Sequence, residues 1–387
     1  MNIVGIAAEF NPFHQGHAQL FKRVRAQGAQ GIVVVMSGCF TQRGEPACMP
    51  PSVRRRAALQ AGADLLIELP LPWAMASADT FAAGAVALLK GLGCVQHMVF
   101  GSESGNMAQL EACLQALQAV DGSQALANAL AEGKSFPRAR MEAVKMLFPT
   151  LDVAPLSRSN DTLALSYLRA CAQQKVQFTP VAVRRDLSFL SGAEIRQKLE
   201  KNPADAWPHV PPEAATLYQQ AVSVGAAPFC FSLAERAVLA QLRCLSSKTL
   251  PALPDVSEGI ENRLVTAAKS AQSLQELYFA VKTKRYPLAR VRRLVWHAFL
   301  HSTKEDRAIL PPYLRVTGIG RQGAKILQLA GRTHSLPLLT RHSACKELDV
   351  VAKRIFHLEE KATDVYHTFL PRVQPAGLAQ KVEILRF

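Results

Sequence analysis

The sequence lacks any Cys-x-x-Cys pair, although it contains eight cysteines. The usual signature of zinc ribbons and thioredoxin-like redox sites is therefore missing. It also lacks an apolar run long enough to cross a bilayer, since the most apolar stretch, residues 65–89, is interrupted by charges and prolines. No basic segment precedes the first apolar residues, so we expect no signal peptide. These absences predict a cytoplasmic protein with reduced cysteines and no membrane partner.

Acidic residues are scarce relative to basic ones. The 387 residues include 45 Lys and Arg but only 30 Asp and Glu, and 49% of them are hydrophobic. Residues 1–200 hold 19 basic and 15 acidic side chains, whereas residues 201–387 hold 26 and 15. A basic second half favours a polyanionic partner, either nucleic acid or an anionic membrane surface. The alternative is an ordinary solvated surface whose charge keeps the protein soluble.

The first half alternates short apolar runs with helical patterns. This alternation predicts an α/β, Rossmann-like domain with a parallel sheet and crossover helices. We expect strands at residues 3–8, 31–36, 65–69, 97–100 and 180–184, helices at 17–26, 52–61, 76–89, 160–172 and 194–200, and a helical pattern from 106 to about 148.

The second half is mainly helical in pattern. Prolines cluster between residues 203 and 212, and we place a domain boundary there. The prediction is a catalytic domain over residues 1–205 followed by a basic, α-helical C-terminal domain over residues 206–387. We expect helices at 234–245, 257–270, 273–283 and 288–301, and one strand at 314–316 with a helix in the stretch 311–332.

A His-x-Gly-His element, His14 to His17, lies between the first expected strand and the first expected helix. Ligands of parallel sheets bind at the carboxyl ends of the strands, and a helix N-terminus there attracts phosphate. Gly16 lets the backbone approach closely, and two imidazoles can donate hydrogen bonds to phosphoryl oxygens as charge develops. The pair could instead ligate a metal, but no third ligand is evident, or could be ordinary surface or core histidines.

The element resembles the nucleotidylyltransferase superfamily, which includes class I aminoacyl-tRNA synthetases and small adenylyltransferases. Further blocks extend the resemblance, and together they are similar to the bacterial tRNA(Met) cytidine acetate ligase family. These blocks are residues 11–17, 36–47, 61–65, 101–103, 159–164, 255–264 and 283–286.

The resemblance implies an ATP-dependent ligase. Acetate attacks the α-phosphate of ATP to give acetyl-adenylate and pyrophosphate. The exocyclic amine of the wobble cytidine of elongator tRNA(Met) then takes the acetyl group, giving N(4)-acetylcytidine and AMP. The implied catalytic residues are His14 and His17. The implied ATP-binding residues are Ala7, Ala8, Glu9, Phe10, Asn11, Pro12, Phe13, His14, Gln15, Gly16, His17, Ala18, Gln19 and Leu20, together with Gly101, Asn160 and Arg185.

Two features depart from the family pattern. The segment 184–190 is short and lacks the family's Gly-rich loop. The next motif has Ala193 where the family commonly has threonine. Ser191 and Arg196 could serve a phosphate at that helix start, or Ser191 could form a capping box with Glu194.

Basic clusters suggest where RNA binds. Six positive charges without an acid, flanked by Tyr286 and Trp296, favour phosphate neutralisation and base stacking over a plain solvated face. A smaller cluster, residues 54–56, either meets the same RNA or coats a helix. The candidate tRNA-binding residues are Lys282, Lys284, Arg285, Arg290, Arg292 and Arg293.

We expect Mg²⁺ to accompany ATP but predict no protein metal site and no protein partner. Glu9 and Glu103 could hold Mg²⁺ or accept backbone N–H groups. Two alternative functions remain open at this stage: a small-metabolite adenylyltransferase, which His-x-Gly-His alone permits, and a catalytically dead RNA-binding module.

Overall fold

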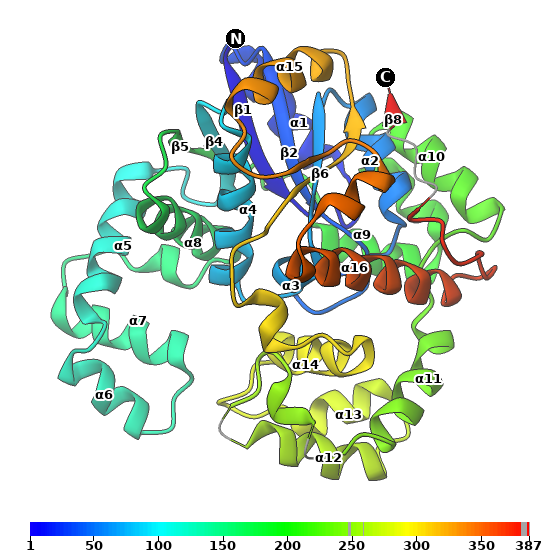
Figure 1. Ribbon diagram of the computed structural model, residues 1–387. Coiled ribbons are helices and arrows are strands. Elements are labelled where there is room, and N and C mark those ends of the chain that lie inside the picture. The colour runs from blue at the N-terminus through cyan, green and yellow to red at the C-terminus, as the bar shows by residue number, and fades with distance from the viewer. Residues whose placement is uncertain (247–248, 258, 381–384, 387) are drawn as a thin grey trace.

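A computed structural model describes residues 1–246, 249–257, 259–380 and 385–386. At its centre is one mixed sheet with the strand order β5-β4-β1-β2-β3-β6-β7, with β8 paired to β6 (Figure 1). Strands β1 to β5 run parallel, as predicted, whereas β6 is antiparallel to β3. The strands are β1 Ile3–Ala8, β2 Gly31–Ser37, β3 Leu65–Leu69, β4 His97–Ser102, β5 Thr179–Arg184, β6 Leu314–Ile319, β7 Leu338–Leu339 and β8 Leu385–Arg386.

Helices cover both faces of the sheet and form a separate bundle beyond its carboxyl edge. The helices are α1 Gln15–Ala26, α2 Pro51–Gln60, α3 Leu71–Ala74, α4 Ala78–Leu92, α5 Met107–Val120, α6 Gln124–Ala131, α7 Phe136–Leu147, α8 Ser159–Gln174, α9 Gly192–Lys201, α10 Pro212–Ser223, α11 Phe231–Arg243, α12 Ile260–Ser270, α13 Leu274–Val281, α14 Leu288–Leu300, α15 Gly323–Thr333 and α16 Val350–Thr368. Short 3₁₀ turns are η1 Ala154–Leu156, η2 Pro203–Asp205, η3 Trp207–His209, η4 Leu250–Ala252, η5 Lys304–Arg307 and η6 His342–Glu347.

The apolar runs of β1 to β3 form strands because they are covered on both faces. Every residue of β2 and β3 is buried, as expected for a parallel sheet between two helical layers. One layer, containing α4, α5 and α8, packs on one face, and the layer of α1, α2 and α10 packs on the other. The prediction of an α/β, Rossmann-like domain is confirmed.

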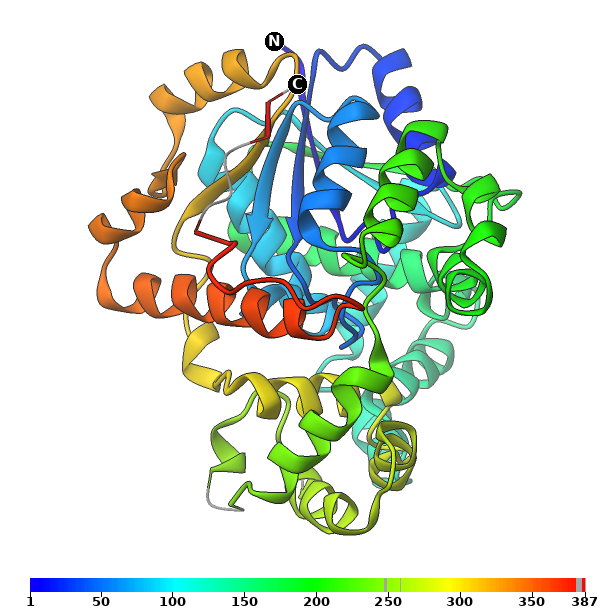
Figure 2. The same cartoon turned by 90° about the vertical axis from the view of Figure 1, so that its right-hand side faces the viewer.

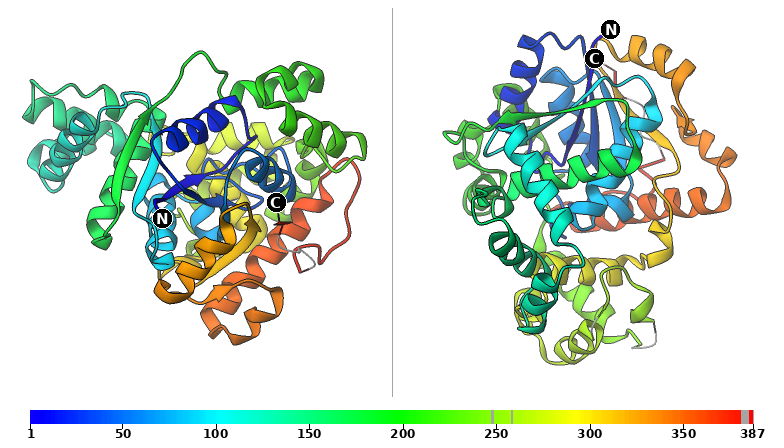
Figure 3. Two further views of the ribbon diagram at one scale, coloured as in Figure 1. Left: turned by 90° about the horizontal axis from the view of Figure 1, so that it is seen from above. Right: turned by 90° about the vertical axis from the view of Figure 1, so that its left-hand side faces the viewer.

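The helical pattern predicted over residues 106–148 is confirmed, but it is divided between several helices. The structure has three helices there, α5, α6 and α7. Helices α5 and α6 end just before Gly122 and Gly133, because both glycines adopt positive φ, 81° and 77°, a conformation that ends helices. The three helices stand out to one side of the sheet (Figure 3).

The packing of the second half differs from the predicted division at residues 205 and 206. Ala206, Val210 and Tyr218 belong to the apolar core beneath α1 and α2, and β6, β7 and β8 extend the sheet. The prolines that suggested a linker instead begin short turns and α10, where a missing N–H costs nothing. We propose that the separately packed helical part spans about residues 229–300, which form their own core with the end of α16.

Helix α16 joins the two parts of the molecule. It runs beneath the sheet and above the bundle of α11 to α14 (Figure 2), and its side chains enter both cores. The predicted helices of the bundle correspond to α11, α12, α13 and α14. Glu258, in the predicted helix 257–270, lies outside the described residues. In the part of the chain that the structure describes, no helix is both long and apolar enough to cross a membrane.

Candidate active site

A cavity of about 780 Å³ opens at the carboxyl ends of β1, β4 and β5. Its walls are the loop after β1, the loop at residues 41–45, the start of α8, the segment after β5 and Ala289 of α14. The sheet and the helical bundle thus share one cavity. The predicted residues that line it are Ala7, Ala8, Glu9, Phe10, Asn11, His14, Gly16, His17, Gln19, Leu20, Gly101, Asn160 and Arg185.

Four of the predicted ATP-binding residues do not line this cavity. Phe13 is fully buried in the core below the loop. Gln15 donates a hydrogen bond to the carbonyl of Pro208, at 3.0 Å. Pro12 and Ala18 also lie outside the lining. The positions of these four residues suit a role in supporting the loop after β1.

The two histidines stack at the N-terminus of α1. His14 is the N-cap residue, and its Nδ1 accepts the N–H of Gly16 at 3.1 Å. Nδ1 of His17 accepts the N–H of His14 at 3.2 Å, and the ring centroids are 3.8 Å apart. A Cβ on residue 16 would come within 2.9 Å of Cε1 of His14, so any larger residue there would displace the His14 ring. Because each Nδ1 accepts, each neutral ring carries its proton on Nε2.

Both rings are neutral in the free protein. Burial, together with the positive charges of Arg185 and Arg196, lowers the pKa of His14 to about 4. Burial, His14 and Arg185 hold the pKa of His17 well below its usual value. Two neutral Nε2–H donors at a helix N-terminus suit an anion whose charge grows during reaction.

Buried side chains from α2 and α10 hold the loop after β1. Arg54 is fully buried and donates to the carbonyls of Glu9 and Gly38, and to that of Met49 at 3.0 Å. The Tyr218 hydroxyl contacts both backbone groups of Phe13, accepting from N at 2.9 Å and donating to O at 3.2 Å. The sequence left two options for residues 54–56. Arg54 is hydrogen-bonded to backbone carbonyls and Arg55 forms an ion pair with Glu68, so neither side chain is free to bind RNA. Of the three arginines only Arg56 is exposed.

The start of α8 brings Asn160 to the cavity. Its Nδ2 donates to Oε1 of Glu103 at 2.6 Å, and the N–H of Asp161 donates to Oε2 at 2.8 Å. Although partial burial opposes it, these hydrogen bonds lower the pKa of Glu103. Glu103 therefore orients Asn160, and its oxygens are occupied. No group among the described residues donates a hydrogen bond to Oδ1 of Asn160, so this oxygen can accept one from a ligand.

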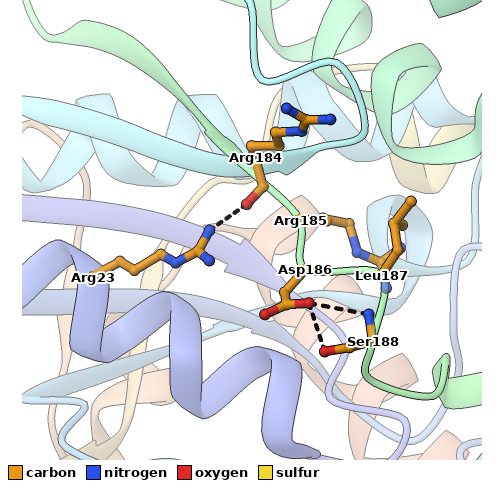
Figure 4. Close-up of a pocket in the computed structure, with 6 residues that line it drawn as sticks. All are labelled: Arg23, Arg184, Arg185, Asp186, Leu187 and Ser188. Atoms are coloured by element: carbon orange, nitrogen blue, oxygen red, sulfur yellow. Dashed lines mark hydrogen bonds between the residues drawn. The ribbon is translucent and has the colours of Figure 1, made fainter.

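Arginines surround the mouth of the cavity. Arg23, Arg184, Arg185 and Asp186 also border a smaller hollow of about 380 Å³ beside it (Figure 4). Arg23 Nη1 donates to the carbonyl of Arg184 at 2.5 Å, which fixes the end of β5 against α1. Within the described residues, no protein group is hydrogen-bonded to the guanidinium of Arg185, so its donors are available to an anion.

The model of a family described as HIGH Nucleotidyl Transferase matches residues 1–381. The tRNA(Met) cytidine acetate ligase of Syntrophomonas wolfei is 36% identical over 96% of this chain and 95% of its own length. That of Geobacillus sp. is 35% identical over 96% and 95%. The chain belongs to the tRNA(Met) cytidine acetate ligase family of HIGH nucleotidyl transferases.

Solved structures agree with this membership in the ligase family. Thermotoga maritima TmcAL bound with alpha-thio ATP is 27% identical and superposes with a TM-score of 0.91 over 100% of both chains. The apo form gives 28% identity and a TM-score of 0.92, again over 100% of both chains.

The motif that departs from the ligase family pattern begins α9. Ser191 forms a capping box with Glu194: its Oγ accepts the N–H of Glu194 at 3.3 Å, and Oε2 of Glu194 accepts the N–H of Ser191 at 2.7 Å. The structure therefore confirms the capping alternative for Ser191. Arg196 Nη1 donates to the carbonyl of Asn11 at 2.7 Å, so it supports the same loop as Arg54.

Much of the basic cluster predicted to bind tRNA has structural partners. Arg293 is buried and pairs with Asp255 at 2.6 Å. Arg290 donates to the Asp255 carbonyl and to the Ser257 hydroxyl, and Arg292 pairs with Glu45. The pKa of Asp255 is lowered to about 2: partial burial raises it, but Arg293, His297 and Arg307 lower it more. The prediction was wrong for Arg293 as a phosphate contact.

The aromatic part of that prediction was also wrong. Tyr286 and Trp296 are both buried, so neither ring can stack on a splayed base. The exposed positive charges are Lys282, Lys284 and Arg285, on the turn between α13 and α14.

Sequence reasoning did not single out Phe100, Tyr167 or Glu45, which all line the cavity. Tyr167 and Phe100 line the cavity and stack with centroids 5.5 Å apart, and Glu45 joins the loop at residues 41–45 to α14 through Arg292. The family-like block 36–47 was the only signal that marked this loop in the sequence.

The two carboxylates considered as Mg²⁺ ligands, Glu9 and Glu103, both accept backbone N–H groups. Among the described residues there is no group of three or more His, Cys, Asp or Glu able to hold a metal. Glu103 already accepts from Asn160 and Asp161, and Glu9 accepts from Gln42. Of the two alternatives in the sequence, the structure favours backbone acceptance for both carboxylates.

Proposed function

We propose that this protein is an ATP-dependent tRNA-modifying ligase that activates acetate as acetyl-adenylate and acetylates the wobble cytidine of elongator tRNA(Met). The observation that carries the proposal is the pair of neutral imidazoles at the carboxyl edge of the sheet, in a chain 36% identical to a tRNA(Met) cytidine acetate ligase. We propose as ATP-binding residues those that the sequence predicted and that line the cavity, whereas Pro12, Phe13, Gln15 and Ala18 support the loop after β1.

For adenylation, the protein has mainly to position acetate and ATP and to stabilise the negative charge that develops on the phosphates. Acetate oxygen forms a bond to the α-phosphorus while the bond to pyrophosphate breaks, and negative charge builds on the departing oxygens. The Nε2–H donors of His14 and His17 and the guanidinium of Arg185 can meet that charge. Because the described residues hold no cluster of three or more potential metal ligands, we propose that Mg²⁺ enters bound to the triphosphate as part of the substrate.

The direct test is to incubate the protein with acetate, ATP and a tRNA(Met) transcript and to measure N(4)-acetylcytidine by mass spectrometry of digested nucleosides. We expect the product only when acetate, ATP and tRNA are all present. A transcript with uridine in place of the wobble cytidine should give none. Pyrophosphate release with another nucleophile and no acetate would support a small-metabolite adenylyltransferase instead. Tight tRNA binding without any ATP turnover would support a binding module.

We propose that tRNA phosphates bind at the turn between α13 and α14. Lys282, Lys284 and Arg285 are exposed there, and Ala289, four residues further along the chain, lines the cavity. Arg290 and Arg292 are bonded to protein groups. We therefore expect them to hold α14 in place more than to bind tRNA phosphates.

Charge reversal of Lys284 and Arg285 to glutamate should weaken tRNA binding and reduce the slope of log affinity against log salt by about 1 to 2. The measurement is a binding titration at several salt concentrations. Lys325→Glu, an exposed charge on α15 at the other end of the sheet, is the control and should leave the slope unchanged. Equal effects of the two variants would place the RNA elsewhere.

A further inference from the structure

One carboxylate in the cavity keeps an oxygen to which no group among the described residues donates a hydrogen bond. Oε1 of Glu9 accepts the N–H of Gln42 at 2.6 Å. Oε2 has no hydrogen-bond partner among the residues that the structure describes. It is also not among the fully buried polar atoms that lack a hydrogen-bond partner. Glu9 lines the cavity, so Oε2 is open to whatever the cavity holds.

The other acids at the cavity are less suited to accept a proton. Both oxygens of Glu103 accept N–H groups. Glu45 forms ion pairs with Arg292 and Arg196. Hydrogen bonds from Ser188 lower the pKa of Asp186 and make it a weaker base.

The surroundings of Glu9 make it a stronger base than a free carboxylate. Burial raises its pKa, and this effect outweighs the hydrogen bond from Gln42 and the charges of Arg43, Arg196 and Arg54. On the α8 side the neighbouring titratable group is Tyr167, whose own pKa is raised by burial and by Glu9. A base of raised pKa transfers protons more effectively near neutral pH.

Glu9 also lies where the two parts of the molecule meet. Its partner Gln42 accepts, at its carbonyl, a hydrogen bond of 3.2 Å from Arg293 of α14. The same loop after β1 carries His14 and His17. A nucleoside that enters from the helical bundle therefore meets Glu9 in the same cavity as the adenylate.

We infer that Glu9 is the proton acceptor for acetyl transfer, an inference that rests on the proposed function. The cytidine N4 lone pair forms a bond to the acetyl carbonyl carbon. The N4 proton passes to Oε2 of Glu9, and the bond from that carbon to the adenylate oxygen breaks with its electron pair leaving on AMP. Glu9 then returns the proton to solvent.

The test separates the two half-reactions. Acetate-dependent exchange of pyrophosphate into ATP reports adenylation, and single-turnover transfer to tRNA(Met) reports the second step. In Glu9→Gln we expect transfer to slow by about 100-fold or more, while exchange falls far less. Glu9→Asp retains a carboxylate, so it should recover part of the transfer rate. Glu213→Gln, which removes an exposed carboxylate from α10, is the control for both assays.

The pH dependence gives a second measurement. A base acts when it is unprotonated, so the transfer rate of the unmodified protein should rise with pH through an inflection above the ordinary glutamate value. That rise should be absent in Glu9→Gln. Equal slowing of both half-reactions, or no slowing of transfer, would overturn the role of Glu9. Unmodified protein that shows no acetate-dependent exchange would instead overturn the proposed function, and this inference with it.

Discussion

Replacing His17 with asparagine should lower acetate-dependent pyrophosphate exchange by roughly 100- to 1,000-fold, the usual loss for one donor aimed at developing charge. The asparagine oxygen can still accept the N–H of His14, as Nδ1 of His17 does at 3.2 Å. It carries no donor at the position of Nε2. The variant therefore removes the proposed catalytic group and keeps the cap of α1.

Glutamine at the same position is the matched variant, because its amide nitrogen reaches close to the position of Nε2. We expect His17→Gln to retain more exchange activity than His17→Asn, and both to unfold at nearly the same urea concentration. His334→Ala, an exposed histidine after α15, should retain full activity. Full exchange in His17→Asn would contradict the assignment of the Nε2 donor.

Replacing Arg54 with methionine should lower the free energy of unfolding by about 3 kcal/mol or more. The fully buried guanidinium of Arg54 donates hydrogen bonds to the carbonyls of Glu9, Gly38 and Met49. Each buried polar group that loses its partner costs about 1–3 kcal/mol. Since two of these carbonyls belong to the loops after β1 and β2, adenylation should also decline.

Arg56 provides the control on the same helix. It is exposed, and Arg56→Met should change the free energy of unfolding by less than about 0.5 kcal/mol. Urea denaturation of both variants gives the comparison. Equal midpoints would mean that Arg54 is dispensable to the fold and that the loop after β1 is held by other contacts.

The regular part of the fold could be predicted because it depends on local pattern. The β-branched run of β2 and the apolar runs of β1 and β3 predict buried strands, and the structure places them at residues 31–37, 3–8 and 65–69. The His-x-Gly-His element is local as well, since a cap and its ring partners lie within three residues.

Long-range contacts could not be predicted in the same way. Strand β6 joins β3 from about 250 residues away in antiparallel register, and Tyr218 reaches the backbone of Phe13 across 205 positions. No short segment contains a signal for such a pairing, because its energy comes from surfaces that meet only after folding.

The sequence by itself determined the alternating strands and helices, the histidine pair at the entry to the first helix and the excess of positive charge. Only the tertiary structure decided which charges are free: Arg54 and Arg293 are buried against protein partners, whereas Lys284 and Arg285 remain exposed. The reason is physical. A residue type fixes the charge and hydrogen-bonding capacity of a side chain, but its burial and its partners depend on segments brought together by the whole fold.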